Sequence, residues 1–321
     1  MPRTFQGEYV TEASKVFQEG DDLWHAGQYD DAREAYQKSA KLYDDNEDNE
    51  GEAFALNRLG ELELSLDNYD RALMVLDTAA GLIKDEEHAQ NTYGDTLIKL
   101  SKVFTSKGDI AKAIKMIREA QKVLDNIANY DLLGDAHDHE AFIHLTQNKE
   151  GDALEAYKKA AECYAKERIE LKEASTLRAI VRIYMKNKRY DEAHDLLERC
   201  RDLYRENGDL LGEASALSAI GTLRYVIGDI GNARKALMKS VYLYGKVSHH
   251  FAEAEALLYL ARVESFNKEQ GDFERAKAHY KRSIELFDFL GNEVMKQAAL
   301  DEYEIFVEKT GKTKEGVSCR K

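Results

Sequence analysis

The pattern that decides the fold stands in residues 221–244, GTLRYVIGDIGNARKALMKSVYLY. Ala233 lies at the middle of this stretch, and an alanine recurs at nearly the same distance along the chain. The recurring alanines are Ala32, Ala72, Ala113, Ala153, Ala193, Ala233 and Ala276, at intervals of 40, 41, 40, 40, 40 and 43 residues. Such regular spacing indicates an internal repeat, which is typical of stacked supersecondary units.

The residues around each alanine repeat as well. Large residues stand four and eleven positions after it in all seven copies, and three positions before it in six of the seven. Small residues stand seven positions after it in every copy. These offsets fall on one face of an α-helix. Because small residues admit a neighbouring helix and large ones fill the space beside it, we expect a helix packed between two others.

A second helix is expected before this one in each copy. The position at which this helix is expected to approach its neighbour closely lies twelve residues before the alanine. In six copies this position is occupied by Gly20, Gly60, Ser101, Ala141, Val181 and Gly221, and five of these residues are small. The expected turns between the two helices lie at residues 27–28, 67–68, 108–109, 148–149, 188–189, 228–229 and 271–272. Gly or Asn suits the left-handed end of a helix, and Asp suits the start of the next. Each copy is therefore predicted to be a helical hairpin.

A small residue, then an alanine twelve residues later, then a large and a small residue resembles the signature of the tetratricopeptide repeat. The resemblance covers roughly residues 9–289 and implies an all-α, right-handed α–α superhelical solenoid of about seven hairpins. The period of 40 exceeds the ~34 residues of the family. The proline that usually ends the second helix is missing, since the only proline is Pro2. A HEAT or armadillo solenoid, whose period is also near ~40, is the alternative fold.

Repeats of this length are similar to those of bacterial peptide-sensing regulators and of cell-polarity adaptors. Because both groups bind peptides, the resemblance implies a peptide-binding function. Along the chain we expect an N-terminal tail at 1–8, a seven-repeat solenoid at 9–289, a capping helix at 290–309 and a disordered tail at 310–321. The cap residues predicted to pack inward are Val294, Ala298, Tyr303, Phe306 and Val307, whereas Glu302 is among those predicted to face water.

Composition excludes several classes of protein. The net charge is −14, and an acidic surface repels nucleic acid and anionic lipid. No stretch approaches the ~18 apolar residues of a membrane span, and residues 1–10 do not form a signal peptide, so we expect a cytoplasmic protein without membrane insertion. The cysteines, Cys163, Cys200 and Cys319, form no CxxC pair, which argues against a disulfide framework or a zinc site. Cys163 and Cys200 fall at core-like positions.

We expect no catalytic activity, cofactor or metal, because no pairing of a nucleophile with a base can be recognised. The densest set of possible metal ligands is His137, His139 and His144 with Asp138 and Glu140. Their spacing is poor for a shared ion, so we interpret them as solvated helix surface. The acidic run at residues 44–52 lacks the glycine and the final glutamate of a calcium loop and is interpreted as an acidic loop between repeats.

In tetratricopeptide solenoids the first helix of each hairpin lines a concave groove, and the resemblance implies groove positions here. The partner-binding candidates are Trp24, Asn57, Lys102, Arg178, Arg182, Lys186, Tyr225 and Arg262, and further groove positions include Ser175 and Ser215. Arg178, Arg182 and Lys186 are spaced four apart, so they share one helix face. We predict that this basic strip, in repeats five to seven, pairs with an acidic or C-terminal peptide. Alternatively, these arginines merely offset the neighbouring Glu170 and Glu173.

The favoured function is therefore a non-enzymatic adaptor or scaffold that binds a protein or peptide segment in the groove. Two alternatives stay open. One is a peptide-responsive regulator, and the other is an accessory binding subunit of a larger enzyme complex. Regulators of that kind carry an added effector module, and since about eight residues precede the first repeat, we expect none there. The oligomeric state is left open.

Overall fold

The computed structural model describes residues 11–266 and 270–318, with the backbone alone at 270–271 and 310–318. The expected tail at 1–8 and Cys319 lie outside the described residues. In the described part, the chain forms fifteen α-helices and one short 3-10 helix. It divides into two compact units, residues 1–169 and 170–321. None of the described helices is both long and apolar enough to cross a membrane.

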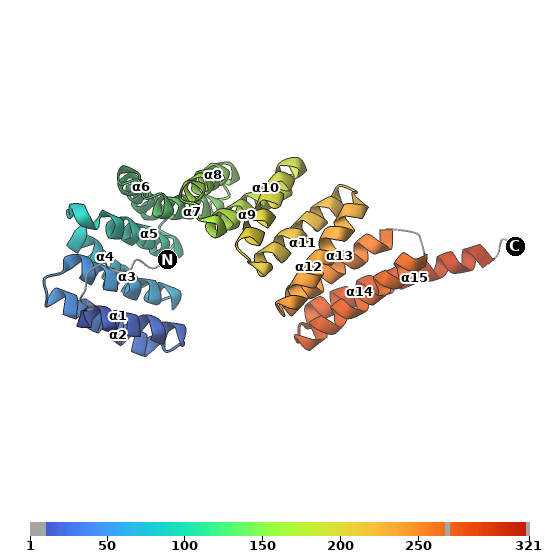
Figure 1. Ribbon diagram of the computed structural model, residues 1–321, viewed down its shortest axis with the longest axis horizontal. Coiled ribbons are helices and arrows are strands. Elements are labelled where there is room, and N and C mark those ends of the chain that lie inside the picture. Colours follow the sequence, from blue (N-terminus) through green and yellow to red (C-terminus); the bar gives the residue numbers. More distant parts are fainter. Residues whose placement is uncertain (1–10, 267–269, 319–321) are drawn as a thin grey trace. The chain divides into compact units, whose positions relative to one another are not determined.

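The first unit is a stack of four hairpins (Figure 1). The hairpins are α1 (Glu12–His25) with α2 (Tyr29–Asp44), α3 (Asn49–Ser65) with α4 (Tyr69–Ile83), α5 (Gln90–Ser106) with α6 (Ile110–Asn126), and α7 (Tyr130–Thr146) with α8 (Glu150–Glu167). The 3-10 helix η1 (Glu87–Ala89) leads into α5. Each second helix packs against its own first helix and, within the unit, against the first helix of the next hairpin.

The second unit repeats the same arrangement. Its hairpins are α9 (Glu170–Lys186) with α10 (Tyr190–Glu206), α11 (Leu210–Val226) with α12 (Ile230–Lys246), and α13 (His250–Phe266) with α14 (Gln270–Phe289). A final helix, α15 (Glu293–Ser318), packs on α14. The prediction of an all-α repeat solenoid is confirmed. The backbone of α15 continues past residue 309, where the cap was expected to end, and the division of the chain into four parts stays a prediction.

The repeating stripe forms the core of both units. All seven recurring alanines are 0% exposed, and the small residues seven positions later are buried just as completely. The large residues at four and eleven positions after the alanine are buried in every copy. The position three before the alanine differs, since Tyr29 is 44% exposed and its counterparts are only half-buried. In all but the last hairpin this residue is the first of the second helix, at the rim of the stack.

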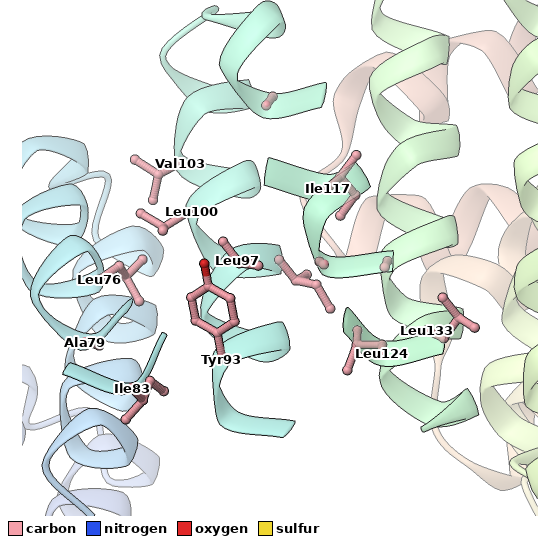
Figure 2. Packing of buried hydrophobic residues seen from close by; sticks show 14 of the residues in the cluster. Leu76, Ala79, Ile83, Tyr93, Leu97, Leu100, Val103, Ile117, Leu124 and Leu133 are labelled. Carbon is pink, nitrogen blue, oxygen red and sulfur yellow. The ribbon is translucent and has the colours of Figure 1, made fainter. Parts of the chain in front are cut away.

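The predicted close approach of two helices is confirmed at Gly60. A methyl group built there would lie 2.5 Å from Cγ of Leu76, the large residue four positions after Ala72. Leu76 is 0% exposed and belongs to the main core cluster of the first unit. Figure 2 shows this cluster between α4, α5 and α6, with Leu76 and Leu100 on neighbouring helices. Gly60 therefore sets how closely α3 and α4 pack.

The turns follow the predicted backbone in six hairpins. The first turn residue has a positive φ in each, at Gly27, Asp67, Gly108, Asn148, Lys188 and Gly228. Asp109 and Asp229 then cap the following helices, because their side chains accept hydrogen bonds from the backbone N–H groups of Lys112 and Asn232. The turn predicted at 271–272 is wrong, since α14 begins at Gln270 and both residues lie in its first turn.

Three junctions between adjacent hairpins share a side-chain pair that the sequence pattern did not reveal. One member of the pair directly follows the recurring alanine in the second helix of a hairpin. The other lies near the C-terminal end of the first helix of the next hairpin. Nε of Arg33 lies 2.5 Å from Oε1 of Glu63, and Nε of Arg234 lies 3.4 Å from Oε1 of Glu264. The roles are exchanged at His194, whose Nε2 lies 3.2 Å from Nη2 of Arg224. The side chains of Glu63 and Glu264 are almost fully buried. We call these contacts the stacking pairs.

The histidine cluster is not a solvated surface, contrary to the interpretation from the sequence. Helix α7 contacts α5, α6 and α8, so few of its side chains reach water. His139 is 8% exposed and stacks on Phe142, and desolvation lowers its pKa to about 4. Nδ1 of His137 lies 3.4 Å from Oε2 of Glu140. Within the described ranges, no group of three or more His, Cys, Asp or Glu side chains is arranged to hold a metal ion.

The inward face of α15 differs in part from the predicted one. Ala299 and Phe306 are buried and Met295 packs on the core, whereas Val294 is 80% exposed and Ala298 is exposed. The start of the buried stripe thus lies one residue later than predicted, and Val307, also predicted to pack inward, is 36% exposed. The prediction that Tyr303 and Phe306 pack inward is confirmed. Among the described residues of α15, Tyr303 and Phe306 contact the ring of Tyr280.

Candidate functional site

The basic strip of the second unit lies on the exposed face of α9. Leu177, Ile180 and Val181 are buried, which leaves the stripe of Ser175, Arg178, Arg182 and Lys186 exposed. This orientation follows from the helical period, because residues three and four apart share one face. The sequence therefore directs these polar side chains away from the core.

Helices α9, α10 and α11 enclose a cleft of about 310 Å³ against this strip. Its polar wall consists of Ser175, Arg178, Arg182 and Ser215. Its apolar wall consists of Ala179, Val181, Leu197, Ala216 and Ala219. The structure thus brings together two predicted arginines and two predicted groove serines, and we call this site the basic cleft. Sequence reasoning missed the alanines, although their small size at positions 179, 216 and 219 is what leaves the space open.

No carboxylate among the described residues forms an ion pair with Arg178 or Arg182. The two acids that might have offset them are already engaged. Nε of Arg199 lies 3.2 Å from Oε1 of Glu173, and the Asn207 amide donates to Glu170. Neither acid forms a direct ion pair with Arg178 or Arg182, and the interpretation in which the arginines offset these acids stays an alternative.

Arg178 is exposed, yet its charge acts on two buried groups beside the basic cleft. Burial raises the pKa of the Cys200 thiol to about 12, and the positive charge of Arg178 opposes that rise. Burial likewise raises the pKa of Tyr244, while Ser215 and Arg178 oppose it. Arg178 and Ser215, on different first helices, are therefore close enough to the same phenol to influence its ionisation. Cys200 is a core residue, as predicted, and its Sγ lies 3.5 Å from the carbonyl oxygen of Ala174.

The first unit contrasts with the basic cleft because two of its first-helix cations pair with neighbouring acids. Nη2 of Arg58 lies 2.8 Å from Oδ1 of Asp21, and Nη1 of Arg58 lies 3.1 Å from Oε2 of Glu61. Lys99 pairs with Asp95. These first-helix cations therefore satisfy acids of their own unit.

The three predicted residues of the first unit occupy different settings. Trp24 is half-buried beneath the guanidinium of Arg58, 5.0 Å from the ring centroid. Asn57 is 2% exposed, and its Nδ2 donates to the carbonyl of Thr92 at 3.5 Å. Lys102 is exposed on α5. Trp24 and Asn57 are thus largely covered by neighbouring side chains.

The remaining candidates lie in the second unit. Tyr225 is half-buried and packs on the small core cluster around Leu237. Arg262 is held by the final helix, because its Nε and Nη2 donate to Glu302 of α15 at 2.8 and 2.5 Å. Glu302 was predicted to face water, and it instead joins α13 to α15. Whether any of the eight candidates contacts a partner stays a prediction.

A second and larger cleft lies between α12 and α13, with a volume of about 470 Å³. It is lined by Ile230, Arg234, Met238 and Glu264, among others. Two of its charges are paired with each other, since Arg234 belongs to a stacking pair with Glu264. Lys235 also lines this cleft, and no ion pair of Lys235 with a described residue is found, so the larger cleft offers one such cation where the basic cleft offers two.

Comparisons with known proteins agree with this architecture. Two family models match, both described as tetratricopeptide repeat, at residues 12–84 and 174–207. The second match spans the hairpin of α9 and α10 that carries Arg178 and Arg182. No curated protein matched the sequence of the chain.

Several solved structures share the fold. A signal transduction ATPase with a tetratricopeptide repeat sensor from Pyrococcus horikoshii is 14% identical, with a TM-score of 0.69 over 89% of this chain and 44% of that one. This chain thus spans less than half of that protein. Aspartyl phosphate phosphatase F from Bacillus subtilis is 15% identical, with a TM-score of 0.59 over 86% and 70% of the two chains. The C-terminal part of a tetratricopeptide repeat protein from Cytophaga hutchinsonii is 17% identical, with a TM-score of 0.53 over 84% and 95%.

Proposed function

Because the chain is a tetratricopeptide repeat protein, we propose that it is a non-enzymatic adaptor that holds an acidic segment of a partner protein in the basic cleft. The observation that carries this proposal is two guanidinium groups, Arg178 and Arg182, that form no ion pair with any described residue and lie in a cleft of a protein whose net charge is −14. Guanidinium groups recognise carboxylates through parallel N–H···O bonds, and such charge-assisted bonds contribute about 1.5–3 kcal/mol each.

The chemistry of the cleft favours binding over catalysis. The residues that line it, within the described part of the chain, are arginines, serines and apolar residues. Arginine keeps its proton at all accessible pH values, so it cannot serve as a general base for either serine. The likeness to a phosphatase and to a sensor concerns the fold alone, and fold does not fix function. A peptide-responsive regulator and an accessory subunit of an enzyme complex stay alternatives.

The proposal is tested by affinity capture of partners from a native cell extract, followed by mass spectrometry. Wild-type protein is compared with Arg178→Ala/Arg182→Ala, which removes both cleft charges. The matched control is Lys281→Ala/Arg282→Ala, which removes the same charge from two exposed residues of α14. We expect one or more partners to be lost from the cleft variant and kept by the control. Identical partners on all three proteins would refute the assignment of this site.

A further inference from the structure

The donors of the basic cleft exceed what one carboxylate can accept. Arg178 and Arg182 each present a planar fork of N–H donors, and Ser175 and Ser215 add two hydroxyl groups to the same wall. A carboxylate has two oxygens and a single negative charge. It can engage one guanidinium in the bidentate manner, which would leave the second arginine with a weaker contact.

A phosphorylated side chain matches this donor set better. It carries a charge between about −1.5 and −2 at pH 7 and three strong acceptor oxygens. Two guanidinium groups balance that charge, and the serine hydroxyls can donate to the remaining lone pairs. Opposing Arg clusters are a general means of recognising phosphate groups. The charge and the donor count therefore both favour a dianion over a monoanion.

The cleft is large enough for a phosphorylated side chain and open enough for the chain that carries it. Its volume is about 310 Å³, and it is open to solvent on one side. Ala179, Ala216 and Ala219 form a smooth apolar wall beside the arginines. The backbone of an extended segment can lie along such a wall, and the reduced access of water strengthens the charge-assisted bonds.

We propose that the basic cleft binds a phosphorylated serine or threonine of a partner protein. This inference rests on the proposed function and narrows it, because an acidic segment then becomes a segment whose binding is switched on by phosphorylation. Arg178 and Arg182 contact the phosphate oxygens, and Ser175 and Ser215 donate hydrogen bonds to it.

The test uses the full chain and three fluorescein-labelled peptides in an anisotropy titration. Each peptide consists of alanine and glycine, is amidated at its C-terminus, and differs only at its centre, which is phosphoserine, glutamate or serine. We expect the phosphoserine peptide to bind at least about tenfold more tightly than the glutamate peptide, and the serine peptide not to bind. Arg178→Ala/Arg182→Ala abolishes binding, and Ser175→Ala weakens binding of the phosphoserine peptide by a few-fold. The charge-matched Lys281→Ala/Arg282→Ala variant behaves as wild type.

The possible results separate the two proposals. Equal affinity for the phosphoserine and glutamate peptides, lost in the double-arginine variant, overturns the phosphate inference and leaves the acidic-segment function standing. Binding of neither peptide, or binding that the double-arginine variant retains, overturns both. Competition by inorganic phosphate at the same concentration as the phosphopeptide also overturns the inference, because the site would then hold a free anion rather than a partner's side chain.

Discussion

The steric cost of a methyl group at Gly60, where α3 and α4 approach closely, can be measured as a change in the free energy of unfolding. In Gly60→Ala the new methyl carbon would lie 2.5 Å from Cγ and 2.6 Å from Cδ2 of Leu76. Leu76 is 0% exposed, so it can move only by displacing the core around it. Overpacking of this kind costs about 1–3 kcal/mol of stability. Alanine also regains about 1 kcal/mol of helix propensity over glycine, which leaves a net loss of up to about 2 kcal/mol.

A control in the same hairpin separates these two effects. Gly81 lies in α4, and a methyl group built there meets nothing within 4 Å. Gly81→Ala therefore gains helix propensity without a clash, and we expect it to stabilise the protein by about 0.5–1 kcal/mol. Because propensity contributes to both variants, the difference between their free energies of unfolding reports the clash, which we expect to be about 1–3 kcal/mol. Both values come from denaturant titrations followed by circular dichroism.

Removing the obstructing side chain completes the test. In a Leu76→Ala background the methyl group at residue 60 has room, so Gly60→Ala should there be neutral or stabilising. Equal stability of Gly60→Ala and Gly81→Ala in the wild-type background would refute the argument that the glycine is required for packing.

Two further contacts give measurable effects. In a double-mutant cycle, Arg262→Ala and Glu302→Gln should show a coupling free energy of about 1 kcal/mol. Either change should also speed amide hydrogen exchange in α15. Independent effects of the two changes would mean that the pair does not hold that helix. His139 should weaken the fold in acid. Burial lowers its folded pKa to about 4, so the unfolded chain binds the proton first as the pH falls from about 6.5, and the free energy of unfolding should drop by up to about 3 kcal/mol between these values. His139→Gln should remove that part of the pH dependence, and an unchanged profile would contradict the assignment.

The fold could be predicted from the sequence because the same pattern of large and small buried residues occurs in seven repeats. Ala72 alone says little, but seven alanines with the same large and small neighbours identify one buried stripe, and every one of them is fully buried. The stripe of α15 occurs only once. Without a repeat to fix its phase, Val294 and Ala298 were assigned to the core when Met295 and Ala299 are the residues that face it.

The candidate site could be predicted only in part. The helical period placed Arg178 and Arg182 on an exposed face, and the structure agrees. The sequence could not show which charges pair across helices, since that depends on the offset between neighbouring hairpins. Arg262 appeared equivalent to Arg182 in the repeat, yet the final helix supplies Glu302 to the former. That no described carboxylate pairs with Arg182 could be seen only from the positions of the neighbouring helices.

The stacking pairs bear on how identical-looking hairpins find the right order. Hairpins of one shape can join the wrong neighbour during folding, or a hairpin of another molecule, which is a typical failure of repeat proteins. The pairs disfavour some incorrect junctions, because Arg33 of α2 lies against Glu63 of α3 whereas His194 of α10 lies against Arg224 of α11. The junction of α12 and α13 repeats the first pairing with Arg234 and Glu264, so the pairs do not distinguish these two junctions from each other. A junction that set Arg33 against Arg224 would oppose two like charges and leave Glu63 buried alone, at a cost of about 3–5 kcal/mol. The stacking pairs thus act against some incorrect orders of the hairpins, in addition to stabilising the junctions at which they occur.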